Sequence, residues 1–171
     1  MRKLPVLLWI GLLFASISLA QKSNENQTAI TKIIIVRHAE KADDGTKNPP
    51  LSPEGLQRAE RLSTMFSDLN ISKLYATPYL RTNQTLTPLS QIFNIAIDSY
   101  DPSDADFAKN LVQKNKGKTV VIAGHSNSSP TLVNRLIQSE KYQKLDESIF
   151  SKMWMLTFEN EQLIDCIVLN Y

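Results

Sequence analysis

The stretch Ile33-Ile34-Ile35-Val36-Arg37-His38 decides the fold that we expect for this chain. A run of β-branched residues without polar alternation is typical of a strand buried on both faces of a parallel sheet. A second apolar run, Thr119 to Ala123, leads directly into Gly124-His125-Ser126-Asn127. Ligands of open α/β sheets bind beyond the carboxyl ends of the strands. If the two strands are neighbours, His38 and His125 therefore face one crevice.

Helices are expected between the strands. The sequence Ser52-Pro53-Glu54 supplies an N-cap, a first-turn proline and an acid, and apolar residues follow it at helical spacing. A second helix should follow Thr77-Pro78, and Pro88 should kink or end it. The other expected elements are strands at 72–76, 95–97, 153–158 and 163–169 and helices after 103–106 and from 129 onward. This alternation predicts an α/β fold, a three-layer sandwich with a mainly parallel central sheet flanked by helices.

Composition narrows the classes of function. The chain has 171 residues, the size of one domain, with 19 Lys and Arg against 17 Asp and Glu. Without Arg2 and Lys3, which lie in a segment that we expect to be removed, 17 bases (19 less 2) face 17 acids. No basic excess attracts a phosphate backbone, so nucleic acid is not an expected partner. The single cysteine, Cys166, excludes an intramolecular disulfide framework and a cysteine-rich zinc site.

The N-terminal segment has the pattern of a secretory signal. Arg2 and Lys3 precede an apolar run from Leu4 to Ala20, and Ser18-Leu19-Ala20 places small residues before a cleavage point. We expect residues 1–20 to be a signal peptide, residues 21–30 a flexible leader and residues 31–171 the folded domain. The product would be periplasmic or secreted, without stable membrane association after cleavage. An uncleaved anchor is the alternative, since the run approaches membrane-spanning length.

Three motifs together resemble the histidine phosphatase (phosphoglycerate mutase-like) superfamily, in particular its small, SixA-like branch-1 members. They are Val36-Arg37-His38-Ala39-Glu40-Lys41, Thr77-Pro78-Tyr79-Leu80-Arg81-Thr82 and Ala123-Gly124-His125-Ser126-Asn127, and the resemblance covers residues 33–137. It implies a phosphoglycerate mutase-like fold and a hydrolase in which His38 becomes phosphorylated. It also implies that Arg37 and Arg81 bind the phosphoryl oxygens and that His125 completes the pocket.

The residue types suit phosphoryl transfer without a cofactor or metal. This reaction needs an in-line nucleophile and positive charge around the equatorial oxygens. Arginine donates two parallel hydrogen bonds to phosphate and keeps its charge, so Arg37→Lys should not be conservative. A neutral His38 can attack through one ring nitrogen if an acceptor, which the sequence does not identify, fixes the other as N–H. Asn127 and the amides that follow it, at the start of a helix, are expected to face the anion.

The proton donor for the leaving group is left open by the sequence. Ser126 occupies the position at which one branch of the superfamily places an aspartate. The carboxylates in the interval where others carry their acid, together with one near the nucleophile, are Asp98, Asp101, Asp104, Asp106 and Glu40. If none of them acts, substrates with good leaving groups are favoured, including protein phosphohistidine.

Two other interpretations compete with a phosphohydrolase acting on a phosphorylated small molecule or a phosphoprotein. A noncatalytic phosphate- or phosphoprotein-binding module would keep the same pocket without a competent acid. A metallohydrolase could use His38, Glu40, Asp43 and His125, although Arg37 would repel its cation.

Overall fold

The computed structural model describes residues 28–171, so the predicted signal peptide and most of the predicted leader lie outside the described residues. The elements in chain order are β1 (Ile30–Arg37), α1 (Pro53–Met65), β2 (Ile71–Ala76), α2 (Leu80–Phe93), β3 (Ile97–Ser99), α3 (Ala105–Lys114), β4 (Thr119–Gly124), α4 (Ser128–Ile137), β5 (Lys152–Glu159) and β6 (Gln162–Asn170). Within this part of the chain no helix combines the length and the apolar character that crossing a membrane requires.

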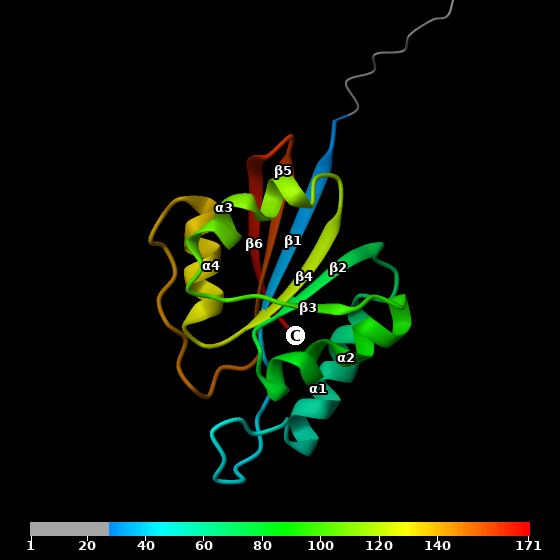
Figure 1. Ribbon diagram of the computed structural model, residues 1–171, viewed down its shortest axis with the longest axis vertical. Coiled ribbons are helices and arrows are strands. Elements are labelled where there is room, and N and C mark those ends of the chain that lie inside the picture. Colours follow the sequence, from blue (N-terminus) through cyan, green and yellow to red (C-terminus); the bar gives the residue numbers. More distant parts are fainter. Residues whose placement is uncertain (1–27) are drawn as a thin grey trace, which may run out of the picture.

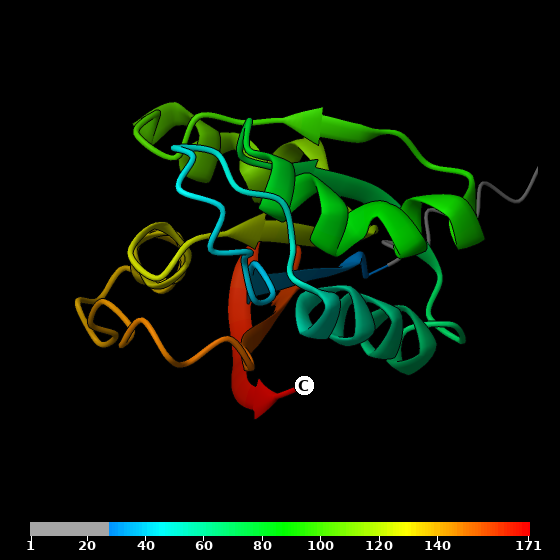
Figure 2. The same ribbon diagram turned by 90° about the horizontal axis from the view of Figure 1, so that it is seen from below.

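The predicted three-layer α/β sandwich is confirmed (Figure 1). One sheet has the strand order β3-β2-β4-β1-β5-β6. The pairs β3–β2, β2–β4 and β4–β1 are parallel, whereas β1–β5 and β5–β6 are antiparallel. The helices α1 and α2 cover one face of the sheet and α3 and α4 cover the other (Figure 2). The short β5–β6 connection explains the antiparallel end, because consecutive strands joined by a tight turn form a hairpin.

The central strand β1 is buried on both faces, as its sequence predicts. Ile34 and Val36 pack with α1 and α2, whereas Ile33 and Ile35 pack with α3 and α4. All of these side chains have 0% exposure. Successive side chains of a strand point to opposite faces, so an uninterrupted apolar run fills both layers of the core. The position of β1 at the centre of the sheet follows from this burial.

The expectations for α2 and β3 are corrected by the structure. Pro88 does not end α2, which continues to Phe93. Pro88 lies buried on the same helix as Leu86 and Leu89, which are fully buried, and this packing outweighs the loss of one helical hydrogen bond. The strand expected at 95–97 begins at Ile97 instead.

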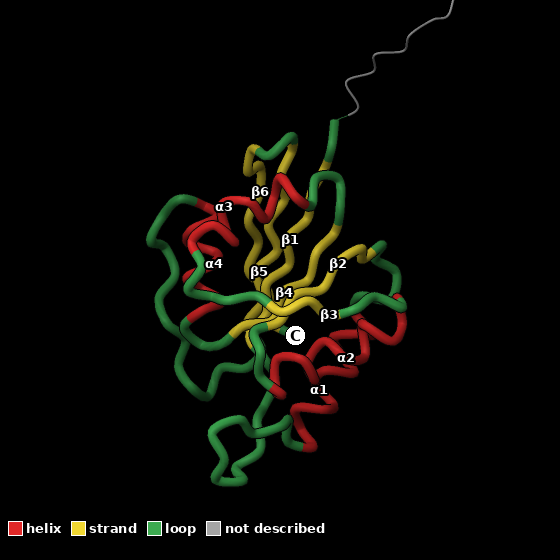
Figure 3. Tube along the Cα trace, viewed as in Figure 1, coloured by secondary structure: helices red, strands yellow, loops and turns green. Residues whose placement is uncertain are grey.

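The register of β1 and β4 positions the candidate site. Arg37 pairs with Gly124, and the backbone N–H of His38 donates to the carbonyl of Gly124 over 2.9 Å. Both strands therefore end at the same level, and His38 and His125 follow them at one edge of the sheet. The connections after β1 and before β5 reach the same end of the molecule (Figure 3).

Candidate active site

A pocket of about 430 Å³ lies beyond the carboxyl ends of β1 and β4. The rings of His38 and His125 approach each other edge to face, with centroids 5.2 Å apart and planes at 69°. The pocket is lined by His38, Lys41, Tyr79, Arg81, Pro102, His125, Ser126, Asn127, Ser128, Lys144 and Glu147. Of the side chains expected from the sequence, the structure thus brings His38, Arg81, His125 and Asn127 to one cavity.

His38 is held as a neutral imidazole with one free nitrogen. Its Nδ1 lies 2.7 Å from the carbonyl oxygen of Ala39, which can only accept, so Nδ1 carries the proton. Its Nε2 then has a lone pair and accepts from Nε–H of Arg81 over 3.2 Å. Burial lowers the pKa of His38 to about 3, with further lowering by His125 and Arg81. The nitrogen that faces Arg81 is therefore unprotonated at neutral pH and can act as a nucleophile once it releases the hydrogen bond from Arg81.

His125 is fixed by Thr77, a residue of the middle motif to which the sequence assigned no role. Thr77 Oγ1 lies 2.8 Å from Nε2 of His125 and donates its own hydrogen to Thr82 Oγ1 over 3.1 Å. Nε2 of His125 is therefore the donor, and its Nδ1 faces Nη2 of Arg81 at 3.4 Å. Burial, then Arg81 and Arg37, lower the pKa of His125 to about 4. Both histidines are thus neutral at pH 7.

Arg81 is a pocket cation with a donor that has no partner. It lies in the first turn of α2, its guanidinium carbon is 4.6 Å from the centre of the Tyr79 ring, and it contacts both histidines. Its Nη1 is buried without a hydrogen-bond partner among the described residues. A buried guanidinium nitrogen without a partner is costly. An oxyanion in the pocket would satisfy it.

Arg37 is placed differently from the expectation. It is not among the pocket-lining residues, and its side chain is 1% exposed. Nη1 donates to the carbonyls of Asp146 and Ile149 over 2.8 and 2.7 Å. Nη2 donates to the carbonyl and to Oε2 of Glu147 over 3.0 and 2.9 Å. The Nη donors that were expected to bind phosphoryl oxygens are therefore committed to residues 138–151, the connection between α4 and β5 that we call the strap.

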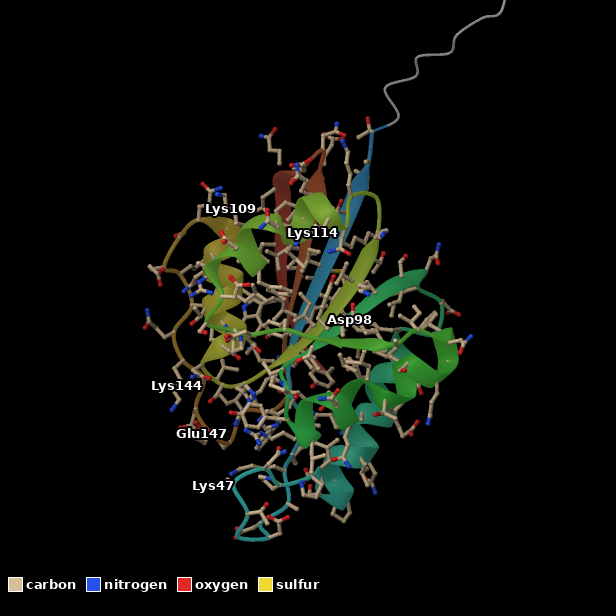
Figure 4. The ribbon with its side chains drawn as sticks, viewed as in Figure 1. Lys47, Asp98, Lys109, Lys114, Lys144 and Glu147 are labelled. Carbon is tan, nitrogen blue, oxygen red and sulfur yellow. The ribbon has the colours of Figure 1, made fainter. Side chains whose placement is uncertain are left out.

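The strap also contributes two charged side chains to the pocket, Lys144 and Glu147, which lie side by side in Figure 4. Oε1 of Glu147 accepts from Oγ of Ser126 over 3.0 Å and pairs with Nζ of Lys144 at 3.2 Å. These two hydrogen bonds, followed by the charge of Arg37, lower the pKa of Glu147, so its carboxylate is ionised at neutral pH. Sequence reasoning missed the strap because its residues show no periodicity and lie far along the chain from Arg37.

Four of the five carboxylates that the sequence offered as proton donors have other partners. Asp98 pairs with Lys73, and Glu40 pairs with Arg58. Asp101 accepts from Ser103, and Asp104 is the N-cap of α3. None of Asp98, Asp101, Asp104, Asp106 and Glu40 lines the pocket. The proton donor is therefore not among them in this arrangement.

One further expectation is corrected by the contacts. The first amides of α4 are not free for an anion, because N–H of Ser128 donates to Oδ1 of Asn127 over 2.8 Å and N–H of Ser129 donates to the carbonyl of His125 over 3.1 Å. Within residues 28–171, no group of three or more His, Cys, Asp or Glu side chains is placed to hold a metal ion.

Comparison with solved structures shows the same fold in phosphatases. A phosphoserine phosphatase from Entamoeba histolytica, solved with 3-phosphoglyceric acid, has a TM-score of 0.63 at 15% identity, covering 82% of this chain and 97% of that chain. A mycobacterial glucosyl-3-phosphoglycerate phosphatase has a TM-score of 0.66 at 10% identity, with coverage of 83% and 98%. The protein histidine phosphatase SixA, solved with tungstate, has a TM-score of 0.64 at 15% identity, with coverage of 81% and 96%.

Sequence comparison gives a match over part of the chain. No curated protein matches the chain. The sequence profile described as "Histidine phosphatase superfamily (branch 1)" matches residues 33–101, which include most of β1, the first two helices and the motifs that carry His38 and Arg81. The chain is therefore similar to branch 1 of the histidine phosphatase superfamily over residues 33–101, and it shares the fold of SixA and related phosphatases.

Proposed function

We propose that this enzyme hydrolyses phosphomonoesters or protein phosphohistidine through a phosphohistidine on His38, without a metal ion. The observation that carries this proposal is the state of His38. Its Nδ1–H is fixed by the Ala39 carbonyl, its Nε2 lone pair faces the pocket, and burial keeps the ring neutral. A neutral imidazole with one fixed N–H is the reactive form of a histidine nucleophile.

The reaction proceeds in two displacements. Nε2 of His38 attacks phosphorus while the bond from phosphorus to the leaving oxygen or nitrogen breaks, and the leaving group departs with the bonding electron pair. Water then attacks the phosphohistidine, the P–N bond breaks, and inorganic phosphate and neutral His38 are released. Arg81 supplies the free Nη1 donor and His125 the second wall of the pocket, where charge spreads over the equatorial oxygens.

Trapping the intermediate tests the proposal. The protein is exposed briefly to radiolabelled 4-nitrophenyl phosphate and quenched in alkaline detergent. We expect protein-bound label that is stable in alkali and lost in mild acid, and that is absent from His38→Ala, whose melting curve shows whether it is folded. A wild-type protein that binds phosphate by calorimetry but takes up no label would instead be the noncatalytic binding module.

The substrate class that we favour has a leaving group that departs easily. The carboxylates that the sequence offered for protonating a poor leaving group lie outside the pocket lining, and the carboxylate in the pocket, that of Glu147, is ionised. The enzyme should therefore have a much higher kcat/KM for a phosphohistidine peptide or 4-nitrophenyl phosphate than for phosphoserine. Comparable values for phosphoserine and the phosphohistidine peptide would contradict this preference.

We also propose that the enzyme is exported and acts in the periplasm or outside the cell. The support is the sequence pattern of residues 1–20. The mature protein should begin at Gln21. The mass of the protein purified from expressing cells, measured by mass spectrometry, tests this. A mass that includes residues 1–20 would contradict cleavage.

A further inference from the structure

The strap places an anion where the pocket is expected to bind one. Oε2 of Glu147 accepts from Nη2 of Arg37 over 2.9 Å, and Oε1 accepts from Oγ of Ser126 over 3.0 Å and from Nζ of Lys144 at 3.2 Å. A guanidinium, an ammonium and a hydroxyl are the donors that bind phosphate in proteins. The carboxylate of Glu147 thus accepts hydrogen bonds from a set of donors of the kind that binds phosphate.

While this contact persists, Arg37 has no Nη hydrogen left for a substrate, and its Nε is buried without a hydrogen-bond partner among residues 28–171. Its two Nη atoms have four hydrogens, and the four hydrogen bonds to the strap use all of them. Three of these bonds end on backbone carbonyls, which are fixed by the path of the strap. The fourth ends on the side chain of Glu147, so it is the one that a ligand can replace without moving the backbone.

The carboxylate of Glu147 can rotate into solvent, whereas the guanidinium of Arg37 is buried and cannot. The side chain of Glu147 is 65% exposed and that of Arg37 is 1% exposed. The strap has independent anchors, because N–H of Leu145 donates to the carbonyl of Ser126 over 2.9 Å and Phe150 lies 4.2 Å from the guanidinium carbon of Arg37. A rotation of the Glu147 side chain into solvent therefore opens Arg37, Ser126 and Lys144 together and leaves the backbone in place.

We propose that Glu147 is an internal competitor for the phosphoryl site, whose carboxylate a bound phosphoryl group displaces from Arg37, Ser126 and Lys144. The inference rests on the proposed function, since it takes this pocket as the phosphoryl site. It assigns Arg37 a conditional role, in which this arginine joins the substrate after the carboxylate has left. Because the carboxylate must first be displaced, phosphate binds more weakly than it would to the same cations without Glu147.

Calorimetric titration with inorganic phosphate tests the proposal without turnover. Glu147→Gln removes the competing charge, so we expect phosphate to bind about two- to fivefold more tightly than to the wild type, the range of an exposed ion pair. Glu147→Asp keeps the charge of the strap but withdraws the carboxylate by one methylene, and it should also bind phosphate more tightly. The KM for 4-nitrophenyl phosphate should fall by a similar factor in both variants.

Glu140→Gln is the matched control, because it makes the same substitution in the same strap, where Glu140 accepts from Asn134 rather than from Arg37. Its phosphate affinity should equal that of the wild type, and melting curves verify that all variants are folded.

Equal or weaker phosphate binding by Glu147→Gln and Glu147→Asp overturns the internal competitor alone. A loss of kcat in Glu147→Gln that is larger for phosphoserine than for 4-nitrophenyl phosphate also overturns it, in favour of a proton donor. Absence of phosphate binding in every variant overturns the proposed function as well.

Discussion

Arg81 donates its Nε–H to Nε2 of His38 over 3.2 Å, so a cation contacts the nitrogen that we assign as the nucleophile. The contact orients the His38 ring and also opposes its protonation, since the charge of Arg81 lowers the pKa of His38. When a phosphoryl group enters, the same guanidinium lies beside its oxygens. Arg81 therefore orients the neutral imidazole of His38 and also stabilises the negative charge on the transferred phosphoryl group.

The first prediction concerns this guanidinium. Arg81→Lys keeps a positive charge but loses the planar fork, so kcat/KM for 4-nitrophenyl phosphate should fall by about 10² to 10³. Arg61→Lys, on an exposed position of α1, is the matched control and should leave kcat/KM unchanged. If Arg81→Lys retains wild-type kcat/KM, a point charge is sufficient and the fork has no role in the transition state.

Thr77 is predicted to act as a positioning residue for His125. Thr77→Val has nearly the same shape but leaves Nε2–H of His125 without its acceptor in a buried site, so kcat/KM should fall about tenfold. Thr77→Ser restores the hydroxyl and should recover most of the rate. A purely structural role would make both variants lose activity in proportion to their loss of thermal stability, which melting curves measure alongside the kinetics.

Gly55 links the first helix to the segment that follows the nucleophile. A Cβ at this position would lie 2.1 Å from the backbone oxygen of Glu40, which must then move. Gly55→Ala should therefore lower the free energy of unfolding by about 1 to 3 kcal/mol, measured by urea denaturation. Gln57→Ala, at an exposed position of the same helix, should change it by less than about 0.5 kcal/mol. An unchanged urea midpoint for Gly55→Ala would show that the helix can shift freely.

The two histidines predict how stability depends on pH. The folded state lowers their pKa values to about 3 and about 4, whereas the unfolded chain titrates near its ordinary value of 6.5. Below pH 6.5 the unfolded chain therefore binds protons that the folded pocket does not, so the free energy of unfolding should fall as the pH drops from about 6.5 toward 4.

Because the chain contains only two histidines, the double variant His38→Gln/His125→Gln removes every such group. In protein without a polyhistidine tag, its melting temperature should change much less between pH 6.5 and 4.5 than that of the wild type. A wild-type melting temperature that does not decrease in this interval would mean that the histidines are protonated in the folded state.

Much of the fold could be predicted because the signals are local. The apolar run before His38 specifies a central strand, and Ser52 caps α1 by accepting from N–H of Gly55, as its place before Pro53 indicates. The same strand-then-histidine pattern at His125 was enough to expect a shared crevice. The general acid could not be predicted, because carboxylates close to the motifs in sequence, such as Asp98 and Glu40, are bound by Lys73 and Arg58 in space.

The sequence by itself determined the layers of the sandwich, the burial of β1 and the placement of the two histidines at strand ends, because apolar periodicity and capping act between neighbours in the chain. Only the tertiary structure decided the partner of Arg37, the acceptor for His125 and the presence of Glu147 in the pocket. Arg37 and Glu147 are separated by 110 positions, and the strap has no periodic pattern. They are in contact because the buried guanidinium of Arg37 requires hydrogen-bond acceptors, and the chain between α4 and β5 passes close enough to provide them.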